Sequence, residues 1–572
     1  MSRPVAKPLV VGSGKLSVGE TAERDSRGKP HLADIPMTKM SVGTDGGGSD
    51  EAEDNMFEAT FTRLYGKMSW NEKSRLFWLA ATLFFIIGGY WLLRSIKDPI
   101  ISTISGVEAI PKAKMLSVVV VTFGVAIYNE LYDRYEPHQL FYLIGGFYTF
   151  LFSVIGLMLM HPTYGIANTD ANPARLLGWV SYCAIESFGS IGVTNFWAFA
   201  NSVYDLERAK KAYGLLIACA QVGSVAGPTL VTQAATIGIP GLYFCGAACM
   251  GLMVVMVFLY VQRFGTEKQA AEAAEVAAVA AGAGSSKPKK KEKAGMLEGL
   301  FIVGRYSYVQ GITAVSCIFM VEVTILDYAM KVLAKAKFEA DHPGDPVGSV
   351  EAFAEFMGFF GQATNTLSFC LSLLGTSFVI RSLGLRITLL LFPTLLLAAG
   401  AVVYMHPSLE LVFVVMLVLK ALSYALNNPC KELLYQPTSK AVKFKAKSWI
   451  DIFGQRGAKA LGSVVTNFYS DSSAMLLSNG MFISMGLSGV LIYVSKWIGD
   501  KFDQYTEAGY VVGADAEAEA NAVDEPELAA EKQTASCAGD TSCALDDEEE
   551  GDDDEDDVGG GKEADSRTSV AV

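Results

Sequence analysis

Several ionisable side chains in this 572-residue sequence lie within or at the end of long apolar stretches, and the candidate site residues among them are Lys97, Glu186, Glu322, Arg456 and Lys459. An ionisable group inside hydrocarbon costs several kcal/mol unless it faces a cavity or a partner, so such groups mark solute or ion pathways. Ammonium and guanidinium groups bind phosphate oxygens, and buried carboxylates hold such cations or take up protons. The set therefore predicts a buried site for a polyanion.

Other interpretations of these charges stay open. Arg94 and Lys97 close an apolar stretch, where long basic side chains also extend to the membrane surface. Glu186 and Glu322 are also compatible with structural ion pairs. Asp327 and Lys331 stand four residues apart and are expected to pair on one helix. Lys420 lies near the middle of its stretch, and the sequence assigns it no role.

An aromatic and polar run at 195–201 (NFWAFAN) includes Asn195, Trp197 and Asn201. Aromatic residues are common where helices leave the membrane, and this is one interpretation of the run. The other is a wall on which a nucleobase stacks, because any base can lie against an aromatic face. The residues alone favour neither interpretation.

Twelve apolar stretches must position these residues. Hydrophobic residues make up 51% of the chain and the mean hydropathy is +0.31, both high for a soluble protein. The stretches are about 20 residues long, enough to cross a bilayer. They lie near 76–96, 112–132, 138–160, 175–201, 211–236, 240–262, 300–334, 353–380, 385–405, 408–427, 447–470 and 475–498.

The stretches divide into two sets of six, with a polar break between them. We expect an all-α membrane protein of twelve transmembrane helices in two six-helix halves that hold a substrate at the midplane. The expected parts are a polar N-terminal segment (1–70), the first half (71–262), an Ala/Glu-rich and basic loop (263–298), the second half (299–500) and an acidic disordered tail (501–572).

Charge is unevenly distributed along the chain. The formal net charge is −14, but residues 501–572 hold 23 acidic and 4 basic residues, a net of −19 that leaves +5 for the rest. Loops on the side of both termini are the more basic ones, which predicts that this side faces the cytosol or its organellar equivalent. Residues 1–55 lack the apolar core of a cleavable signal peptide, so targeting is expected to be internal.

Nothing in the sequence indicates an enzyme. There is no phosphate-binding loop of the GxxxxGK[ST] type, the five histidines are scattered, and Cys537 and Cys543 lack neighbouring metal ligands. We therefore expect no catalytic residues, no metal, no cofactor and no nucleic-acid partner. The lipid bilayer is the one partner that composition itself implies.

The chain resembles the ATP/ADP translocase family, the nucleotide transporters of plastids and intracellular bacteria, over about residues 75–500. The motifs that carry the resemblance are 92–99 (LLRSIKDP), Glu186 with 195–201 (NFWAFAN), 209–213 (AKKAY), 321–324 (VEVT), 428–435 (NPCKELLY), 445–451 (KAKSWID) and Lys459. The substrate-linked charges of that family, two lysines and two glutamates, correspond to Lys97, Glu186, Glu322 and Lys459.

The resemblance implies a major-facilitator-like fold and the transport of nucleotides such as ATP or ADP by alternating access. Exchange and proton-coupled uptake both remain open, and so does the membrane, with the plastid envelope or the endoplasmic reticulum expected. We expect a monomer. The alternatives are a proton-coupled transporter of another organic anion or phosphate ester, and a receptor or scaffold that acts through the acidic tail.

Overall fold

Long helices make up nearly all of the computed structural model, which describes residues 69–204, 206–265, 296–374, 376–470 and 472–514. The first and last expected parts and the loop at 263–298 lie mostly outside these residues. The described residues belong to one unit, Tyr65–Val572, and contain no β-strand, only an isolated bridge between Thr438 and Val512.

The helices before the central loop pack around α2, whose ends are defined by local sequence. Ser69 and Glu72 form a reciprocal capping box at its start, and Gly106 ends it with a φ of 95°, which favours glycine. These helices are α2 (Trp70–Ser105), α3 (Ala109–Arg134), α4 (Pro137–Leu159), α5 (Leu176–Val203), α6 (Leu206–Val231), the short α7 (Ala234–Ile237) and α8 (Ile239–Phe264).

The helices after the loop are interrupted by four π-helical turns. They are α10 (Met296–Arg305), α11 (Ser307–Asp341), α12 (Pro346–Leu374), α13 (Thr376–Met405), α14 (Leu409–Leu422), α15 (Asn428–Leu433), α16 (Lys447–Trp449), α17 (Gln455–Phe468), α18 (Ser473–Met475) and α19 (Met481–Ala508). The π turns are η1 (Ser423–Asn427), η2 (Val442–Ala446), η3 (Ile450–Gly454) and η4 (Leu476–Gly480). Such turns inside helices occur frequently at functional sites.

Ten of the described helices are long and apolar enough to cross a membrane. The two other expected spans are present as helices but are more polar: α12 carries Gln362, Asn365 and Thr364, and α16 to α17 carry Arg456 and Lys459. The expected span at 300–334 is divided, because the chain leaves the helical conformation at Tyr306 between α10 and α11. The structure thus agrees with an all-α, multi-pass membrane fold.

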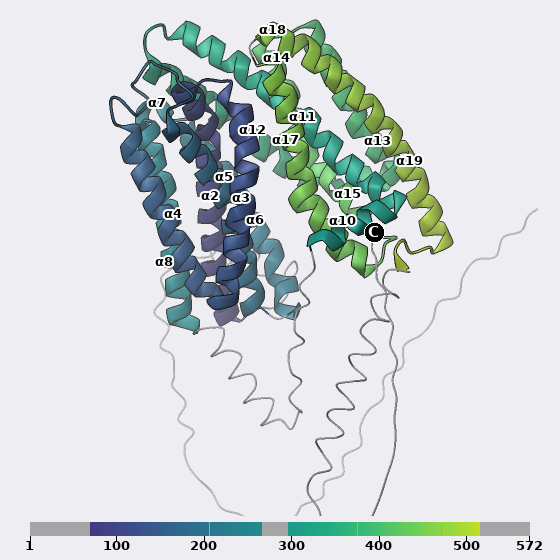
Figure 1. The fold of residues 1–572 in the computed structure, drawn as a ribbon. Coiled ribbons are helices and arrows are strands. Elements are labelled where there is room, and N and C mark those ends of the chain that lie inside the picture. The colour runs from purple at the N-terminus through teal and green to yellow at the C-terminus, as the bar shows by residue number, and fades with distance from the viewer. Residues whose placement is uncertain (1–68, 205, 266–295, 375, 471, 515–572) are drawn as a thin grey trace, which may run out of the picture. The chain divides into compact units, whose positions relative to one another are not determined.

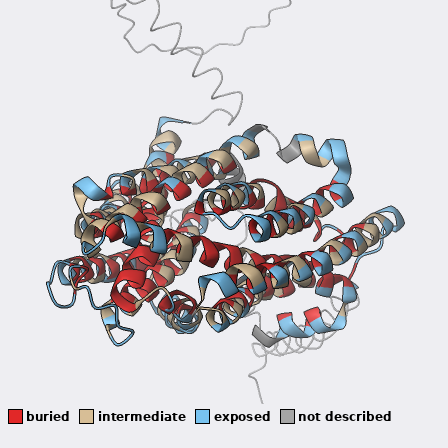
Figure 2. Cartoon of the chain, turned by 90° about the horizontal axis from the view of Figure 1, so that it is seen from above, coloured by how far each residue is buried: buried red, intermediate tan, exposed pale blue. Residues whose placement is uncertain are grey.

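Two clusters of buried apolar side chains stabilise the structure, one centred on each set of helices. Figure 1 shows the purple-to-blue helices of the first set beside the green-to-yellow helices of the second. In Figure 2 buried residues lie mainly on the inner faces of the helices. Large apolar side chains such as Phe150 and Tyr493 are exposed at the surface, 71% and 72% respectively. A helix bundle with apolar outer faces fits a lipid environment.

Candidate substrate cavity

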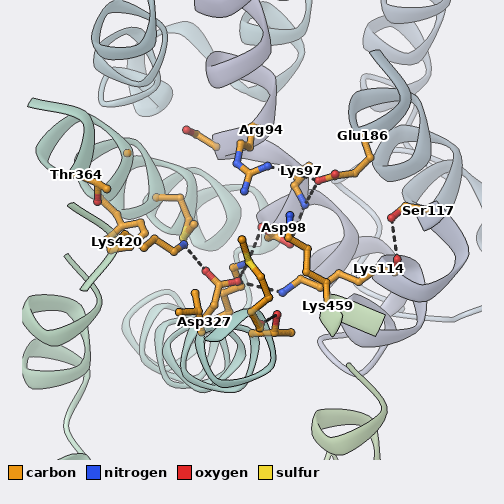
Figure 3. A pocket seen from close by; sticks show the side chains of 18 of the residues that line it. Arg94, Lys97, Asp98, Lys114, Ser117, Glu186, Asp327, Thr364, Lys420 and Lys459 are labelled. Carbon is orange, nitrogen blue, oxygen red and sulfur yellow. Dashed lines mark hydrogen bonds and ion pairs between the residues drawn. The ribbon is translucent and has the colours of Figure 1, made fainter. Parts of the chain in front are cut away.

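A polar cavity lies where the two sets of helices meet, and its wall takes residues from α2, α3, α5, α11, α12, α14, η1 and α17 (Figure 3). Seven basic and three acidic side chains line it, so the formal charge of the wall is +4. These ten residues are Arg94, Lys97, Lys114, Lys331, Lys420, Arg456, Lys459, Asp98, Glu186 and Asp327. A wall of this sign, set among low-dielectric helices, attracts anions strongly.

Helix α2 brings three of these charges to the cavity. Arg94, Lys97 and Asp98 are three and four residues apart, so they share one face of the helix. The Lys97 ammonium is almost fully buried, lies 3.0 Å from Glu186 Oε1 and stands 3.7 Å from the centre of the Tyr182 ring. Arg94 lies 3.8 Å from the same carboxylate oxygen and donates a hydrogen bond to Tyr90. The predicted pair of Lys97 and Glu186 is therefore present as a direct contact.

Helix α17 supplies the opposing cations from the second set of helices. Arg456 and Lys459 are three residues apart and both line the cavity. Arg456 Nη2 donates a 2.7 Å hydrogen bond to Ser190 Oγ of α5. Lys459 has no ion-pair partner within the described residues, and its side chain is exposed in the cavity. It is thus a cation available to a bound anion.

Glu322, the fourth family-linked charge, is placed differently. Its neighbours Met320, Val323 and Thr324 line the cavity, whereas Glu322 itself is fully buried on the side of α11 that faces α19. Ser488 Oγ donates a hydrogen bond to one carboxylate oxygen, and the other oxygen has no hydrogen-bond partner among the described residues. The structure does not bring Glu322 to either lysine.

The aromatic run at the end of α5 also lies away from the cavity wall. Asn195 is buried and accepts a hydrogen bond from Tyr128. Trp197 packs edge-on against Tyr213, whose hydroxyl donates to the Asn201 side chain. The aromatic residues that do line the cavity are Trp91, Tyr182, Phe319, Phe360 and Tyr424.

Sequence reasoning missed part of the site. The expected pair of Asp327 and Lys331 is confirmed, but Asp327 also contacts Lys420 at 2.6 Å and Lys114 at 3.1 Å (Figure 3). Lys114 was not among the expected site residues, yet it lies in α3 and lines the cavity. The sequence signals for this group of charges were the four-residue spacing of Asp327 and Lys331 and the mid-stretch position of Lys420.

Comparison with known proteins decides the family. A profile described as TLC ATP/ADP transporter matches residues 51–413, more than half of the chain. The chain belongs to the TLC ATP/ADP transporter family. This membership confirms the resemblance seen in the motifs, and the relatives below are named as carriers or transporters.

Relatives in the TLC ATP/ADP transporter family come from plants and bacteria. The chain is 24% identical over 474 residues to the chloroplastic ADP,ATP carrier protein 1 of Arabidopsis thaliana, covering 73% of this chain and 72% of that protein. It is 25% identical over 519 residues to ADP,ATP carrier protein 1 of Chlamydia muridarum, covering 81% and 93%. These similarities extend over both sets of helices.

Solved transporter structures share the fold of this TLC family member. The nucleoside transporter NupG aligns with a TM-score of 0.51 at 12% identity, covering 75% of this chain and 99% of NupG. The peptide transporter POT in complex with sulfate aligns with a TM-score of 0.50 at 15% identity, covering 74% and 95%. At these identities the likeness concerns the fold alone, which is the expected major-facilitator-like one.

Proposed function

We propose that the protein carries nucleotides such as ATP and ADP across an organellar membrane by exposing the cavity to each side in turn. The observation that carries the proposal is the wall charge of +4 at the junction of two helix sets. A nucleoside triphosphate carries about −4 near neutral pH, since its terminal phosphate holds nearly two charges. Membership of the TLC ATP/ADP transporter family supports the same substrate class.

Lys97, Lys459 and Arg456 are the proposed phosphate ligands. Lys459 is exposed in the cavity without an ion pair in the described residues, whereas Lys97 is held by Glu186. A phosphate oxygen can replace Glu186 as the partner of Lys97 at small net cost, because the lysine exchanges one anion for another. When the site is empty, Glu186 is the counter-ion of Lys97. Arg456 supplies a planar donor fork from the other side of the cavity.

The base of the nucleotide needs an apolar face in the same cavity. Trp91 and Tyr424 line it from α2 and η1, and we propose these two rings as the stacking partners. Aromatic faces accept any base, so they contribute affinity without selecting adenine. Asn195, Trp197 and Asn201 support α5 in this proposal and do not touch the base.

The coupling mode is proposed from Glu322. This carboxyl is buried, has one hydrogen bond from Ser488 and lacks a nearby cation within the described residues. An ionised carboxylate is costly in such surroundings, so protonation and deprotonation would accompany structural change. We propose exchange as the basic mode, with Glu322 as the group through which protons could be coupled. We also propose that the carrier functions as a monomer, because the cavity wall comes from one chain.

A transporter of another organic anion or phosphate ester would use the same basic wall, so substrate competition decides between the two. Purified full-length protein in liposomes loaded with ADP should take up labelled ATP. Excess unlabelled nucleotides should block this uptake, and excess sugar phosphates should leave it unchanged. Inhibition by sugar phosphates equal to that by nucleotides would refute nucleotide selectivity. Absence of all transport, with the acidic tail binding a partner protein, would favour the receptor or scaffold alternative.

A further inference from the structure

Five charged residues of the cavity wall, which we call the inter-half cluster, connect the two sets of helices. They are Asp98 of α2, Lys114 of α3, Asp327 and Lys331 of α11, and Lys420 of α14. Two ion pairs cross between the sets: Lys331 Nζ lies 2.9 Å from Asp98 Oδ2, and Lys114 Nζ lies 3.1 Å from Asp327 Oδ2. Each set of helices therefore provides one acid and one base to the other.

The cluster lies toward the end of the bundle at which α2 turns into α3. Asp98 is seven residues from the end of α2, about 10 Å along the helix, and Lys114 is close to the start of α3. Other contacts between the sets lie toward the same end: Tyr328 donates to the carbonyl of Val107, and the backbone of Ala235 donates to Glu355. The ion pairs thus belong to the contact that holds this end together.

The two acids cannot neutralise the three bases of the inter-half cluster. Asp327 contacts three ammonium groups at once, and Asp98 contacts two, those of Lys331 at 2.9 Å and Lys97 at 3.7 Å. Buried ion pairs gain little net free energy because removing both charges from water offsets their attraction. A phosphate chain, with more charge and more oxygens than a carboxylate, can therefore compete for these lysines.

We propose that the inter-half cluster is a second anion subsite and that a bound phosphate chain opens the contact between the halves by taking Lys331 and Lys114 from Asp98 and Asp327. This inference rests on the proposed function for its natural ligand and extends it to the coupling between binding and movement. The Lys97 ammonium lies 3.7 Å from Asp98 Oδ1 in the same cavity, so the cluster adjoins the Lys97 site and one chain of phosphates can contact both. An empty carrier keeps its two crossing ion pairs and stays closed at the α2–α3 end, which favours exchange over net transport.

Two variants separate the subsite from the contact. Asp98→Asn and Lys331→Gln each remove the same crossing ion pair, but the first raises the wall charge by one and the second lowers it by one. Both should loosen the α2–α3 end. Only Lys331→Gln should weaken anion binding, and Asp98→Asn should leave binding equal or tighter. Lys337→Gln is the matched control, since Lys337 lies on the same helix and pairs with Glu410 within its own half, away from the cavity.

The probe is inorganic tripolyphosphate with purified full-length protein. Titration calorimetry should give an affinity about tenfold weaker for Lys331→Gln than for wild type, a change expected for one lost charge near the ligand. Hydrogen–deuterium exchange should rise in peptides covering 99–108 and 334–346 when wild type binds tripolyphosphate. In the absence of ligand it should already be raised in both Asp98→Asn and Lys331→Gln. The control should match wild type in both measurements.

Unchanged tripolyphosphate affinity in Lys331→Gln would overturn the subsite. Unchanged deuterium exchange in both cluster variants, or in wild type with tripolyphosphate, would overturn its role in opening. Nucleotide exchange by wild type in liposomes is measured separately and tests the proposed function. Failure of that transport, with the tripolyphosphate results as expected, would leave the subsite in place and assign it to a different polyanion.

Discussion

The contact of Lys97 with Glu186 allows the phosphate-ligand role to be separated from a structural role. The Lys97 ammonium lies 3.0 Å from Glu186 Oε1, and Arg94 lies 3.8 Å from the same atom. Lys97→Ala removes a charge-assisted contact to phosphate, worth about 1.5–3 kcal/mol. Because about 1.4 kcal/mol corresponds to a factor of ten, kcat/KM for nucleotide exchange should fall about 10- to 150-fold.

The double variant decides the interpretation. If Lys97 only neutralises Glu186, then Lys97→Ala combined with Glu186→Gln should regain exchange, because no unpaired carboxylate remains. If Lys97 binds phosphate, the double variant should be at least as slow as Lys97→Ala alone. Labelled ATP uptake into ADP-loaded liposomes measures each rate, normalised to protein in the membrane. Lys501→Ala, which alters a lysine of α19 that lies outside the cavity wall and donates a hydrogen bond to Gln504, is the control.

Recovery of exchange to near the wild-type rate in the double variant would refute the phosphate-ligand role of Lys97. A loss of protein from the membrane in Lys97→Ala would instead reveal a folding defect. Thermal unfolding of each purified variant identifies that case, because a buried ion pair broken on one side costs about 3–5 kcal/mol of stability. Arg94 still lies beside Glu186 in Lys97→Ala, so the loss of unfolding free energy should stay below this range.

Three further predictions follow from the site and its surroundings. Lys459→Ala should slow exchange about 10-fold or more. It should not lower thermal stability, since Lys459 has no ion pair in the described residues. An unchanged KM for ATP would contradict the role of Lys459 as a phosphate ligand. Glu322→Gln should abolish uptake driven by a proton gradient while exchange survives, and equal loss of both modes would defeat the proton-coupling role. Truncation after Ala514 should leave exchange intact, whereas truncation before Val512 should impair it, because Val512 forms backbone hydrogen bonds with Pro437 and Ser439. A greater loss of exchange in the first truncation than in the second would contradict this.

Charge within apolar sequence was an effective guide to part of the site. Glu186 was recognisable because it lies deep in a stretch that must cross the membrane, and Lys97 because it lies at the end of another; the structure places them in contact. Lys114 gave no such signal. It lies five residues from the start of α3, where a lysine that reaches the membrane surface looks the same in sequence.

Helix rotation was the information that the sequence lacked. Helix α5 is apolar or small around much of its circumference, so nothing in its pattern showed that Glu186 faces the cavity while Asn195 does not. In the second set, η1 adds a π turn after α14, and Lys420, Ser423 and Tyr424 all line the cavity. A regular helical period does not anticipate that insertion. Helices α12 and α17 are not among the ten described helices long and apolar enough to cross a membrane, and polar residues that lower their hydropathy, such as Thr364, Arg456 and Lys459, line the cavity.

The cavity wall charge of +4 has an electrical consequence. With ATP bound, at about −4, the wall and its occupant sum to nearly zero, whereas with ADP, at about −3, about one positive charge remains. A membrane potential acts on a moving charge with about 2.3 kcal/mol per 100 mV and leaves a neutral unit unaffected. Voltage should therefore bias the step that carries ADP and spare the step that carries ATP. Current recordings on planar bilayers with each nucleotide in turn would show that asymmetry, and equal voltage dependence of the two steps would rule it out.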